Sequence, residues 1–268
     1  MISRLRRYKA CCAAVMHPRR ILLYFVLLAA RPALAAGQTD LLLAAANDAE
    51  LRPLIVQLSS LRTETRAAWT FWLGTFEGKT VVLTRTEGDP LNAVAATTLA
   101  VRRYHPRLVV TYGLARAHDP ALRSGDIVAS EKFALFDGFI SAPTQLGQGS
   151  NPLSWTPQPY ELMTAGEKEV EFPVFPADRR SLALAITLQP LRGRIVAGVL
   201  GSANQVNREA DRIAWLRQHW GTSCEDGESA QIAGCAELLG IPAIGLRIID
   251  GTDAEAAALA GQFVKAWN

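Results

Sequence analysis

The stretch ESAQIAGCAELLGIPAIGLRIID, residues 228–250, contains a helix pattern followed directly by a strand pattern. Small and apolar residues recur with helical spacing until Gly240 and Pro242 end the run. The segment AIGLRII that follows is apolar throughout apart from Arg247, as expected of a strand buried on both faces. A helix that leads straight into such a strand is typical of α/β proteins in which helices cover both faces of the sheet.

The same alternation extends along the chain from residue 41 to the end. WTFWLGTF and TVVLTRT flank Glu77-Gly78-Lys79, which is typical of a hairpin turn, so we expect a mixed rather than a parallel sheet. We therefore predict a single α/β domain with three layers, α/β/α, around a mixed central sheet. The predicted strands are 41–46, 69–76, 80–86, 107–113, 124–130, 194–202 and 243–250, and the predicted helices are 47–58, 88–105, 181–190, 208–221, 227–240 and 253–267.

The first 35 residues differ from the rest in charge. They hold seven of the 28 Lys and Arg residues and no Asp or Glu, which leaves 21 cations against 25 anions, a net of −4, in the remainder. The formal charge of +3 for the whole chain therefore belongs to the N-terminal segment. The remainder has no basic patch that would indicate a nucleic-acid partner.

This N-terminal segment has the pattern of an export signal. A basic stretch from His17 precedes ten apolar residues at 21–30, and Ala33 and Ala35 form the small-residue pattern of a signal peptidase site. Ten apolar residues are too few for a permanent membrane span, although an uncleaved anchor is the alternative. We expect a signal peptide at 1–35 with cleavage near Ala35, a periplasmic or secreted product, and one domain over 36–268. A loop-rich insertion rich in Pro, Gly, Ser and Gln is expected around 142–175.

Two cysteines, Cys224 and Cys235, would remain after cleavage. In an oxidising compartment they could pair as a disulfide. A small buried thiol is favoured at Cys235 because it lies within an apolar run. The sequence leaves both states open.

Polar residues follow the predicted buried strands, where ligands bind in open α/β sheets. Glu228 opens the helix of the first quoted stretch, and we expect it to turn into the same cleft, whereas its neighbours Glu225 and Asp226 read as solvated acids at the helix entrance. Zinc spacings, a G-x-S-x-G elbow and a Walker loop are all missing from the sequence, so we predict no metal and no cofactor. The residues that follow strands are Glu50, Gly113, Asn204, Gln205, Asp250 and Asp253, with Arg247 just before the last two.

Four motifs in this order resemble the nucleoside phosphorylase and nucleosidase superfamily. They are the acid after the first strand, GDPLNA at 88–93, GDIVAS at 125–130, and the quoted stretch at 228–250. The pattern is closest to methylthioadenosine/S-adenosylhomocysteine nucleosidases and spans roughly 41–268, less the insertion. In such enzymes an acid protonates the leaving purine, a glutamate orients the attacking water, and a carboxylate grips the ribose hydroxyls.

The resemblance implies specific roles. It assigns water positioning to Glu50 and the ribose hydroxyls to Glu228. The expected R-x-x-S-D acid is replaced by RIIDGTD, so Asp250 is the predicted general acid and Asp253 the second choice. The predicted catalytic residues are thus Glu50 and Asp250, and the predicted substrate-binding residues are Glu228, Arg247, Gly113, Asn204, Gln205 and Asn92.

Two departures from the family pattern bear on the reaction. Leu114 stands where a serine is expected, and the segment 202–207 carries amides where an aromatic ring is expected. We expect an exported nucleosidase that hydrolyses the N-glycosidic bond of a purine-type nucleoside, and the resemblance implies a homodimer. The alternatives are a purine nucleoside phosphorylase, kept open by Arg52, Arg85 and Arg116, and a non-catalytic periplasmic nucleoside- or base-binding protein.

Overall fold

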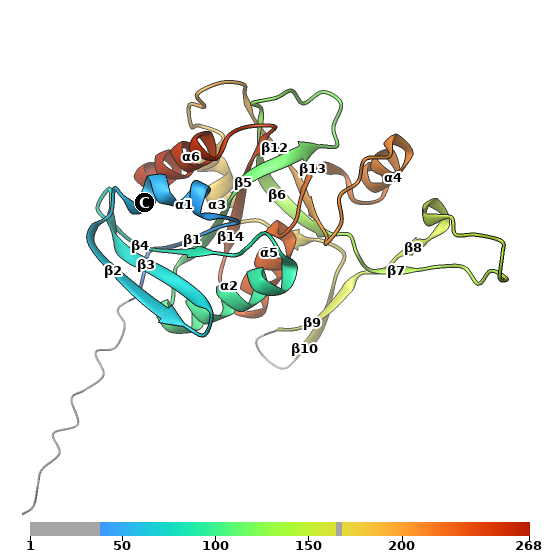
Figure 1. Cartoon of the computed structure of the whole chain (residues 1–268), viewed down its shortest axis with the longest axis horizontal. Helices are drawn as coiled ribbons and strands as arrows, with labels where there is room; N and C mark the ends of the chain where they lie inside the picture. Colours follow the sequence, from blue (N-terminus) through green and yellow to red (C-terminus); the bar gives the residue numbers. More distant parts are fainter. Residues whose placement is uncertain (1–37, 165–167) are drawn as a thin grey trace, which may run out of the picture. The chain divides into compact units, whose positions relative to one another are not determined.

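A ten-stranded mixed sheet forms the centre of the protein (Figure 1). The structure is a computed structural model that describes residues 38–164 and 168–268, so the expected signal peptide lies outside the described residues. The strands run in the order β11-β6-β12-β13-β5-β1-β4-β3-β2, and β14 pairs with both β5 and β6. The strands are β1 (Leu41–Ala45), β2 (Ser59–Arg66), β3 (Trp69–Phe76), β4 (Lys79–Arg85), β5 (Leu108–Ala117), β6 (Ile127–Leu135), β11 (Phe175–Pro176), β12 (Ile195–Ser202), β13 (Thr222–Asp226) and β14 (Ala243–Ile249).

The predicted mixed sheet is confirmed. β1 lies parallel to β4 and β5, while β3 is antiparallel to β2 and β4. Glu77 and Gly78 connect β3 to β4 with φ values of 48° and 77°, the conformation of a tight hairpin turn. One half of the sheet closes on itself, because β14 joins β5 to β6 while β12 and β13 join β6 back to β5.

Helices cover both faces of this sheet (Figure 1). α6 contacts both α1 and α3 on one face, and α2 packs with α5 on the other. The predicted helices are thereby confirmed, and they supply much of the core through Leu51, Ala96, Ile232 and Phe263. The helices are α1 (Asp48–Ile55), α2 (Pro90–Tyr104), α3 (Arg179–Ala185), α4 (Ala210–Trp220), α5 (Ser229–Leu238) and α6 (Asp253–Ala266). No helix in the part of the chain that the structure describes is long and apolar enough to cross a membrane.

Three strands of the central sheet escaped prediction: β2, β11 and β13. β2 is polar and almost entirely exposed at the sheet edge, so it carries no alternating apolar pattern. β13, with the sequence TSCED, is short and mostly polar but lies between β12 and β5 inside the sheet. Its burial matters for the site described below, because it takes Glu225 and Asp226 out of solvent.

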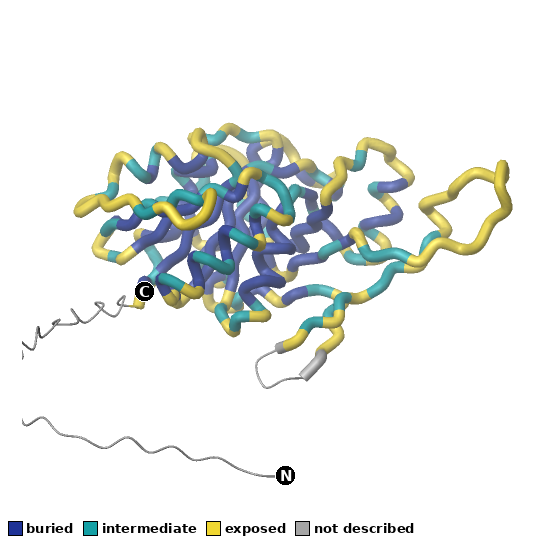
Figure 2. The backbone as a smooth tube through the Cα atoms, turned by 60° about the horizontal axis from the view of Figure 1, so that its bottom comes forward, coloured by how far each residue is buried: buried dark blue, intermediate teal, exposed yellow. Residues whose placement is uncertain are grey.

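The expected insertion around 142–175 includes the second strand of one small hairpin and the whole of another, rather than irregular chain alone. β7 (Phe139–Ile140) pairs with β8 (Thr156–Pro157), and β9 (Tyr160–Thr164) pairs with β10 (Lys168–Phe172). Figure 2 shows that the first hairpin and its loop are largely exposed. A short 3-10 turn at Pro152–Ser154 precedes Trp155, whose ring lies 5.7 Å from that of Phe139.

Candidate active site

A buried arginine lies at the centre of a cluster of carboxylates. Arg247 comes from the middle of β14, and its side chain is 2% exposed. Its Nε lies 2.9 Å from Asp226 Oδ2, and its Nη2 donates to Thr111 Oγ1 at 2.9 Å and lies 3.6 Å from Glu228 Oε1. A guanidinium enclosed to this degree is stable only when anionic and hydrogen-bonding partners replace water.

Glu228 is the residue immediately before α5, as predicted, and it turns inward. Its Oε2 is hydrogen-bonded to the hydroxyl of Thr86, whose oxygen also lies 3.0 Å from the carbonyl oxygen of Ala45. Its Oε1 has no hydrogen-bond partner among the described residues. Burial raises the pKa of Glu228 to about 7, and repulsion from Asp226 and Glu50 adds to this, while Arg247 and Thr86 oppose it.

Glu50 reaches the same arginine from the first helix. Asn47 caps α1 by accepting from the backbone N–H of Ala49 and Glu50, which fixes the loop after β1. The Glu50 carboxylate is buried and accepts from the backbone N–H of Ala46 at 2.8 Å. Burial raises its pKa; Arg247 and the Ala46 N–H act against this, while Asp253 adds to it.

Gly113 makes this approach sterically possible. It lies within β5 with φ of 149°, and a Cβ built on it would be 2.6 Å from Glu50 Oε1 and 3.1 Å from Arg247 Nη1. The carboxylate and the guanidinium therefore occupy the space that a side chain would take. The structure thus brings three predicted site residues, Glu50, Glu228 and Arg247, together beside the fourth, Gly113.

The assignment of Asp226 to solvent is wrong. Its side chain is 5% exposed, and Oδ1 accepts from the backbone N–H groups of Glu228 and Ser229 at 2.7 Å and from Ser202 Oγ at 3.0 Å. Burial alone would raise the pKa of Asp226, but Arg247 and these hydrogen bonds hold it below its usual value. Asp226 therefore caps α5 and orients Arg247.

The assignment of Glu225 to solvent is wrong for a similar reason. It is buried, and it accepts from the backbone N–H of Asn207 at 2.9 Å and from its side-chain amide at 2.6 Å. His118 Nε2 lies 3.1 Å from Oε2, and His118 Nδ1 is 2.8 Å from Thr222 Oγ1. Although burial acts to raise it, the pKa of Glu225 is lowered by these hydrogen bonds. This carboxylate ties the loop that follows β12 to the centre of the sheet.

A cavity of about 330 Å³ lies beside the cluster, at the ends of β5, β13 and β14 and the loop after β12. Its polar lining includes Arg116, Gln205, Glu225, Asp226 and Asp250. Asp226, the partner of Arg247, is part of this lining, so the cavity adjoins the arginine cluster, although Glu50, Glu228 and Arg247 do not themselves line it. Ligands in α/β proteins bind at this kind of edge.

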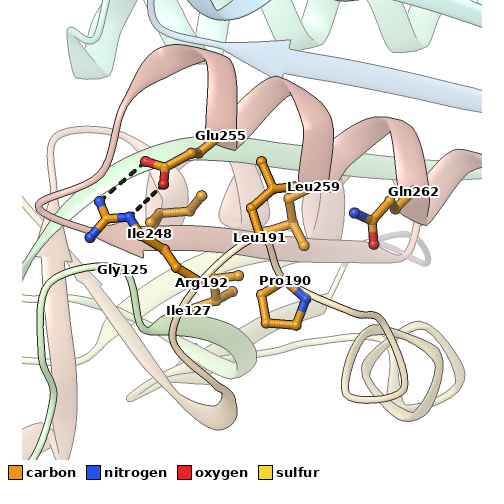
Figure 3. Close-up of a pocket in the computed structure, with 9 residues that line it drawn as sticks. All are labelled: Gly125, Ile127, Pro190, Leu191, Arg192, Ile248, Glu255, Leu259 and Gln262. Carbon is orange, nitrogen blue, oxygen red and sulfur yellow. Dashed lines mark hydrogen bonds and ion pairs between the residues drawn. The ribbon is translucent and has the colours of Figure 1, made fainter.

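Asp250 reaches the cavity rather than the arginine cluster. It is exposed, with φ of 43°, and its backbone N–H donates to Ala115. Its carbonyl accepts from Ser124 Oγ at 3.1 Å and faces Arg192 at 3.4 Å. Arg192 in turn pairs with Glu255, and both side chains line a cavity of about 10 Å³ (Figure 3). The contacts of the Asp250 backbone with Ser124 and Arg192 therefore fix the turn that contains this residue.

The other predicted substrate ligands are distributed unevenly. Gln205 lines the cavity, whereas Asn204 is exposed and is not part of its lining. Asn92 lies in the first turn of α2, where its backbone N–H faces Asp89 Oδ1, and it makes no contact with the arginine cluster in the structure. Asp253, the second choice for the acid, starts α6 close enough to Glu50 to affect its pKa.

Sequence reasoning missed the hydroxyls that complete the cluster. Thr86 directly follows β4 and Thr111 lies within β5, and both are fully buried. Each hydroxyl contacts one charged side chain, Glu228 for Thr86 and Arg247 for Thr111. A polar residue in an otherwise apolar strand was the available signal. His118 was also missed.

Within the described ranges 38–164 and 168–268, no group of three or more His, Cys, Asp or Glu side chains could hold a metal ion. Cys224 and Cys235 are free, buried thiols.

Comparison with known proteins agrees with the fold. The family profile described as "Phosphorylase superfamily" matches residues 40–267, so the chain belongs to this superfamily. The 5'-methylthioadenosine/S-adenosylhomocysteine nucleosidase of Marinomonas sp. is 35% identical over 92 residues, which cover 34% of this chain and 40% of that protein. The enzyme of the same name from Shewanella oneidensis is 28% identical over 206 residues, 75% of this chain and 79% of that protein. The chain spans about half the length of most of the curated relatives it matches.

Solved structures share the same fold. A nucleosidase of this name from S. pneumoniae, bound to a transition-state inhibitor, superposes with a TM-score of 0.69 at 18% identity, covering 85% of this chain and 100% of that chain. The Colwellia psychrerythraea protein, in complex with adenine, gives a TM-score of 0.67 at 21% identity, covering 87% of this chain and 96% of that chain. At these identities the likeness concerns the fold, and the chemistry must be argued from the side chains.

Proposed function

We propose that this protein hydrolyses the N-glycosidic bond of a purine nucleoside. The supporting observation is the convergence of Glu50, Glu228 and Arg247 beside a cavity large enough for a base. The chain's membership of the Phosphorylase superfamily and its similarity to methylthioadenosine/S-adenosylhomocysteine nucleosidases support the same reaction class.

The reaction needs three contributions, and each has a residue in this proposal. Water attacks C1′ and loses its proton to Glu50, whose raised pKa makes it a stronger base than an exposed glutamate. The C1′–N9 bond breaks, and its electron pair leaves with the base, which takes up a proton from Asp250 at the cavity. Glu228 accepts hydrogen bonds from the ribose hydroxyls through Oε1, which has no hydrogen-bond partner in the described residues.

Hydrolysis is favoured over phosphorolysis by charge. The cavity is lined by Glu225, Asp226 and Asp250 against a single exposed arginine, Arg116. A phosphate dianion there would meet more negative than positive charge, whereas water carries none. Leu114, which also lines the cavity, offers no hydroxyl to a phosphate oxygen.

The test is release of free base from adenosine, methylthioadenosine and inosine by the pure protein, with and without phosphate. Release without phosphate is expected, and the Glu50→Gln variant should lose about 100-fold or more in kcat. Glu77→Gln, which alters an exposed turn residue, is the matched control and should leave kcat unchanged. Strict dependence on phosphate would rule out hydrolysis, and no release from any purine nucleoside would rule out the enzyme.

A nucleoside- or base-binding protein without turnover is the second candidate. It is favoured by one observation: Asp250 lies at the cavity mouth, outside the arginine cluster, where its carboxylate is solvated. Calorimetry with purine nucleosides separates the two, because binding without base release would support the binding protein.

We also propose that the protein is exported and acts as a homodimer. The basic and apolar pattern of residues 1–35 supports export, and the family resemblance supports the dimer. N-terminal sequencing of the protein from its native host, with a new N-terminus near residue 36, tests export. Light scattering tests the dimer, and a monomeric mass would contradict it.

A further inference from the structure

Two carboxylates of the cavity lining, Glu225 and Asp226, are already satisfied by the protein itself. Glu225 accepts two hydrogen bonds from Asn207 and faces His118. Asp226 pairs with Arg247 and accepts from three further donors. Neither carboxylate therefore needs a ligand.

Three polar side chains of the lining have no such partner. In the described part of the chain, Arg116, Gln205 and the carboxylate of Asp250 form no hydrogen bond or ion pair within the protein, and all three are exposed. Arg116 lies directly opposite Glu225 in the antiparallel pairing of β5 with β13. Opposed residues of such a pair project to the same face of the sheet, so the guanidinium belongs to the cavity side.

The free groups define what a base in the cavity must offer. A guanidinium presents several N–H donors in a planar fork and binds two adjacent acceptors together. The N7 and O6 atoms of a 6-oxopurine form such a pair of acceptors, and arginine reads guanine in this way in DNA. The N1–H of the same ring is a donor beside O6, which suits the amide oxygen of Gln205 and leaves Asp250 as the proton donor of the proposed reaction.

A 6-aminopurine fits these groups less well. Its exocyclic amino group would place N–H donors where O6 would be, so it would face the donors of Arg116. One hydrogen bond is lost and a donor is left unpaired, and a site built around such a bond discriminates strongly against the mismatched base.

We propose that the cavity recognises a 6-oxopurine base and that Arg116 is the residue that selects it. This inference rests on the proposed function, since it names the substrate class of the same site. It departs from the curated relatives, whose names refer to adenine nucleosides. Arg116 donates to N7 and O6, and Gln205 contacts the remaining edge of the ring.

The experiment compares kcat/KM for inosine and adenosine in three proteins: wild type, Arg116→Met and Arg102→Met. Arg102 is also an exposed arginine, but it lies near the end of α2 and is not part of the cavity lining. The wild type should prefer inosine by about tenfold or more. Arg116→Met should lower kcat/KM for inosine by about 10- to 100-fold and leave adenosine within about twofold, while Arg102→Met should change neither.

Equal use of adenosine and inosine by the wild type would overturn the inference, as would an equal loss for both substrates in Arg116→Met. If no nucleoside is cleaved, the proposed function fails, and the inference is then decided by calorimetry with hypoxanthine and adenine. Tighter binding of hypoxanthine that is lost in Arg116→Met alone would support it. Equal affinity for both bases would overturn it.

Discussion

Arg247 and Asp226 form an ion pair with an Nε–Oδ2 distance of 2.9 Å in which both side chains are at most 5% exposed. The same guanidinium lies 3.6 Å from Glu228, and it lowers the pKa of Glu50 as well. One guanidinium thus interacts with three carboxylates. Glu50 and Glu228, which lie farther from it than Asp226 does, have raised pKa values. The pair with Asp226 is structural, which leaves Glu50 and Glu228 chemically available.

Removing the cation should therefore destabilise the fold. Arg247→Met leaves three buried carboxylates without their partner, and we expect the free energy of unfolding to fall by about 3–5 kcal/mol. Urea denaturation measures the change. Arg217→Met is the matched control, because Arg217 pairs with Asp119 at 3.5 Å with both side chains about one-third exposed. The control should lose less than about 1 kcal/mol, and a loss as small in Arg247→Met would contradict the central role of the arginine.

Glu228 should make stability depend on pH. Its pKa is about 7 in the folded protein and 4.5 without burial, so its contribution is fully present below about pH 4.5 and is lost as the pH rises through 7. Relative to Glu228→Gln, the wild type should lose up to about 3 kcal/mol between these values. Urea unfolding of both proteins at several pH values measures this, and a constant difference would refute the raised pKa.

The same ionisation should affect substrate use in the opposite direction. The carboxylate form of Glu228 accepts a hydrogen bond from a ribose hydroxyl through Oε1, whereas a proton on Oε1 would turn this oxygen into a donor. We expect kcat/KM to rise as the pH increases through about 7, and this rise should be absent in Glu228→Gln. A rise that persists in the variant would assign the titration to another group.

The sequence predicted the elements that carry a continuous apolar pattern, and through them much of the site. β14 and α5 follow from the run 228–250, and the ends of buried strands correctly brought Glu50 and Glu228 to one place. β13 could not be found in this way. Its two acids pair with Arg247 and His118, which are distant in the sequence. The local sequence of the strand is therefore typical of a solvated loop.

The position of Asp250 shows a second limit. A shift of one residue relative to the expected acid turns a side chain to the other face of a strand, and only the local backbone decides the outcome. Here the chain leaves β14 with φ of 43° at Asp250, which directs it to the cavity. Such a turn depends on contacts with Ala115 and Ser124, from other parts of the sheet.

Glu225 should act as a positioning residue for the loop after β12. It holds Asn207 by two hydrogen bonds, and Gln205 and Val206 of this loop line the cavity. Glu225→Gln weakens the contacts with Asn207 and His118, so we expect KM to rise about tenfold with kcat within about threefold. Hydrogen exchange of residues 203–209 should accelerate in the variant. Unchanged exchange together with a lower kcat would instead indicate a direct part in the reaction.

Gly113→Ala tests whether the exact placement of Glu50 matters. The new Cβ would lie 2.6 Å from Glu50 Oε1 and 3.1 Å from Arg247 Nη1, so the carboxylate must move. A displacement of about 1 Å in a group that orients water can cost about 100-fold in rate, and we expect kcat to fall by this amount. Gly147→Ala is the matched control, because Gly147 also has a positive φ, 89°, but has nothing within 4 Å of its Cβ position. Both variants introduce backbone strain of about 1 kcal/mol, and only Gly113→Ala should lose activity. An equal loss of kcat in the two variants would show that strain, and not the position of Glu50, limits the reaction.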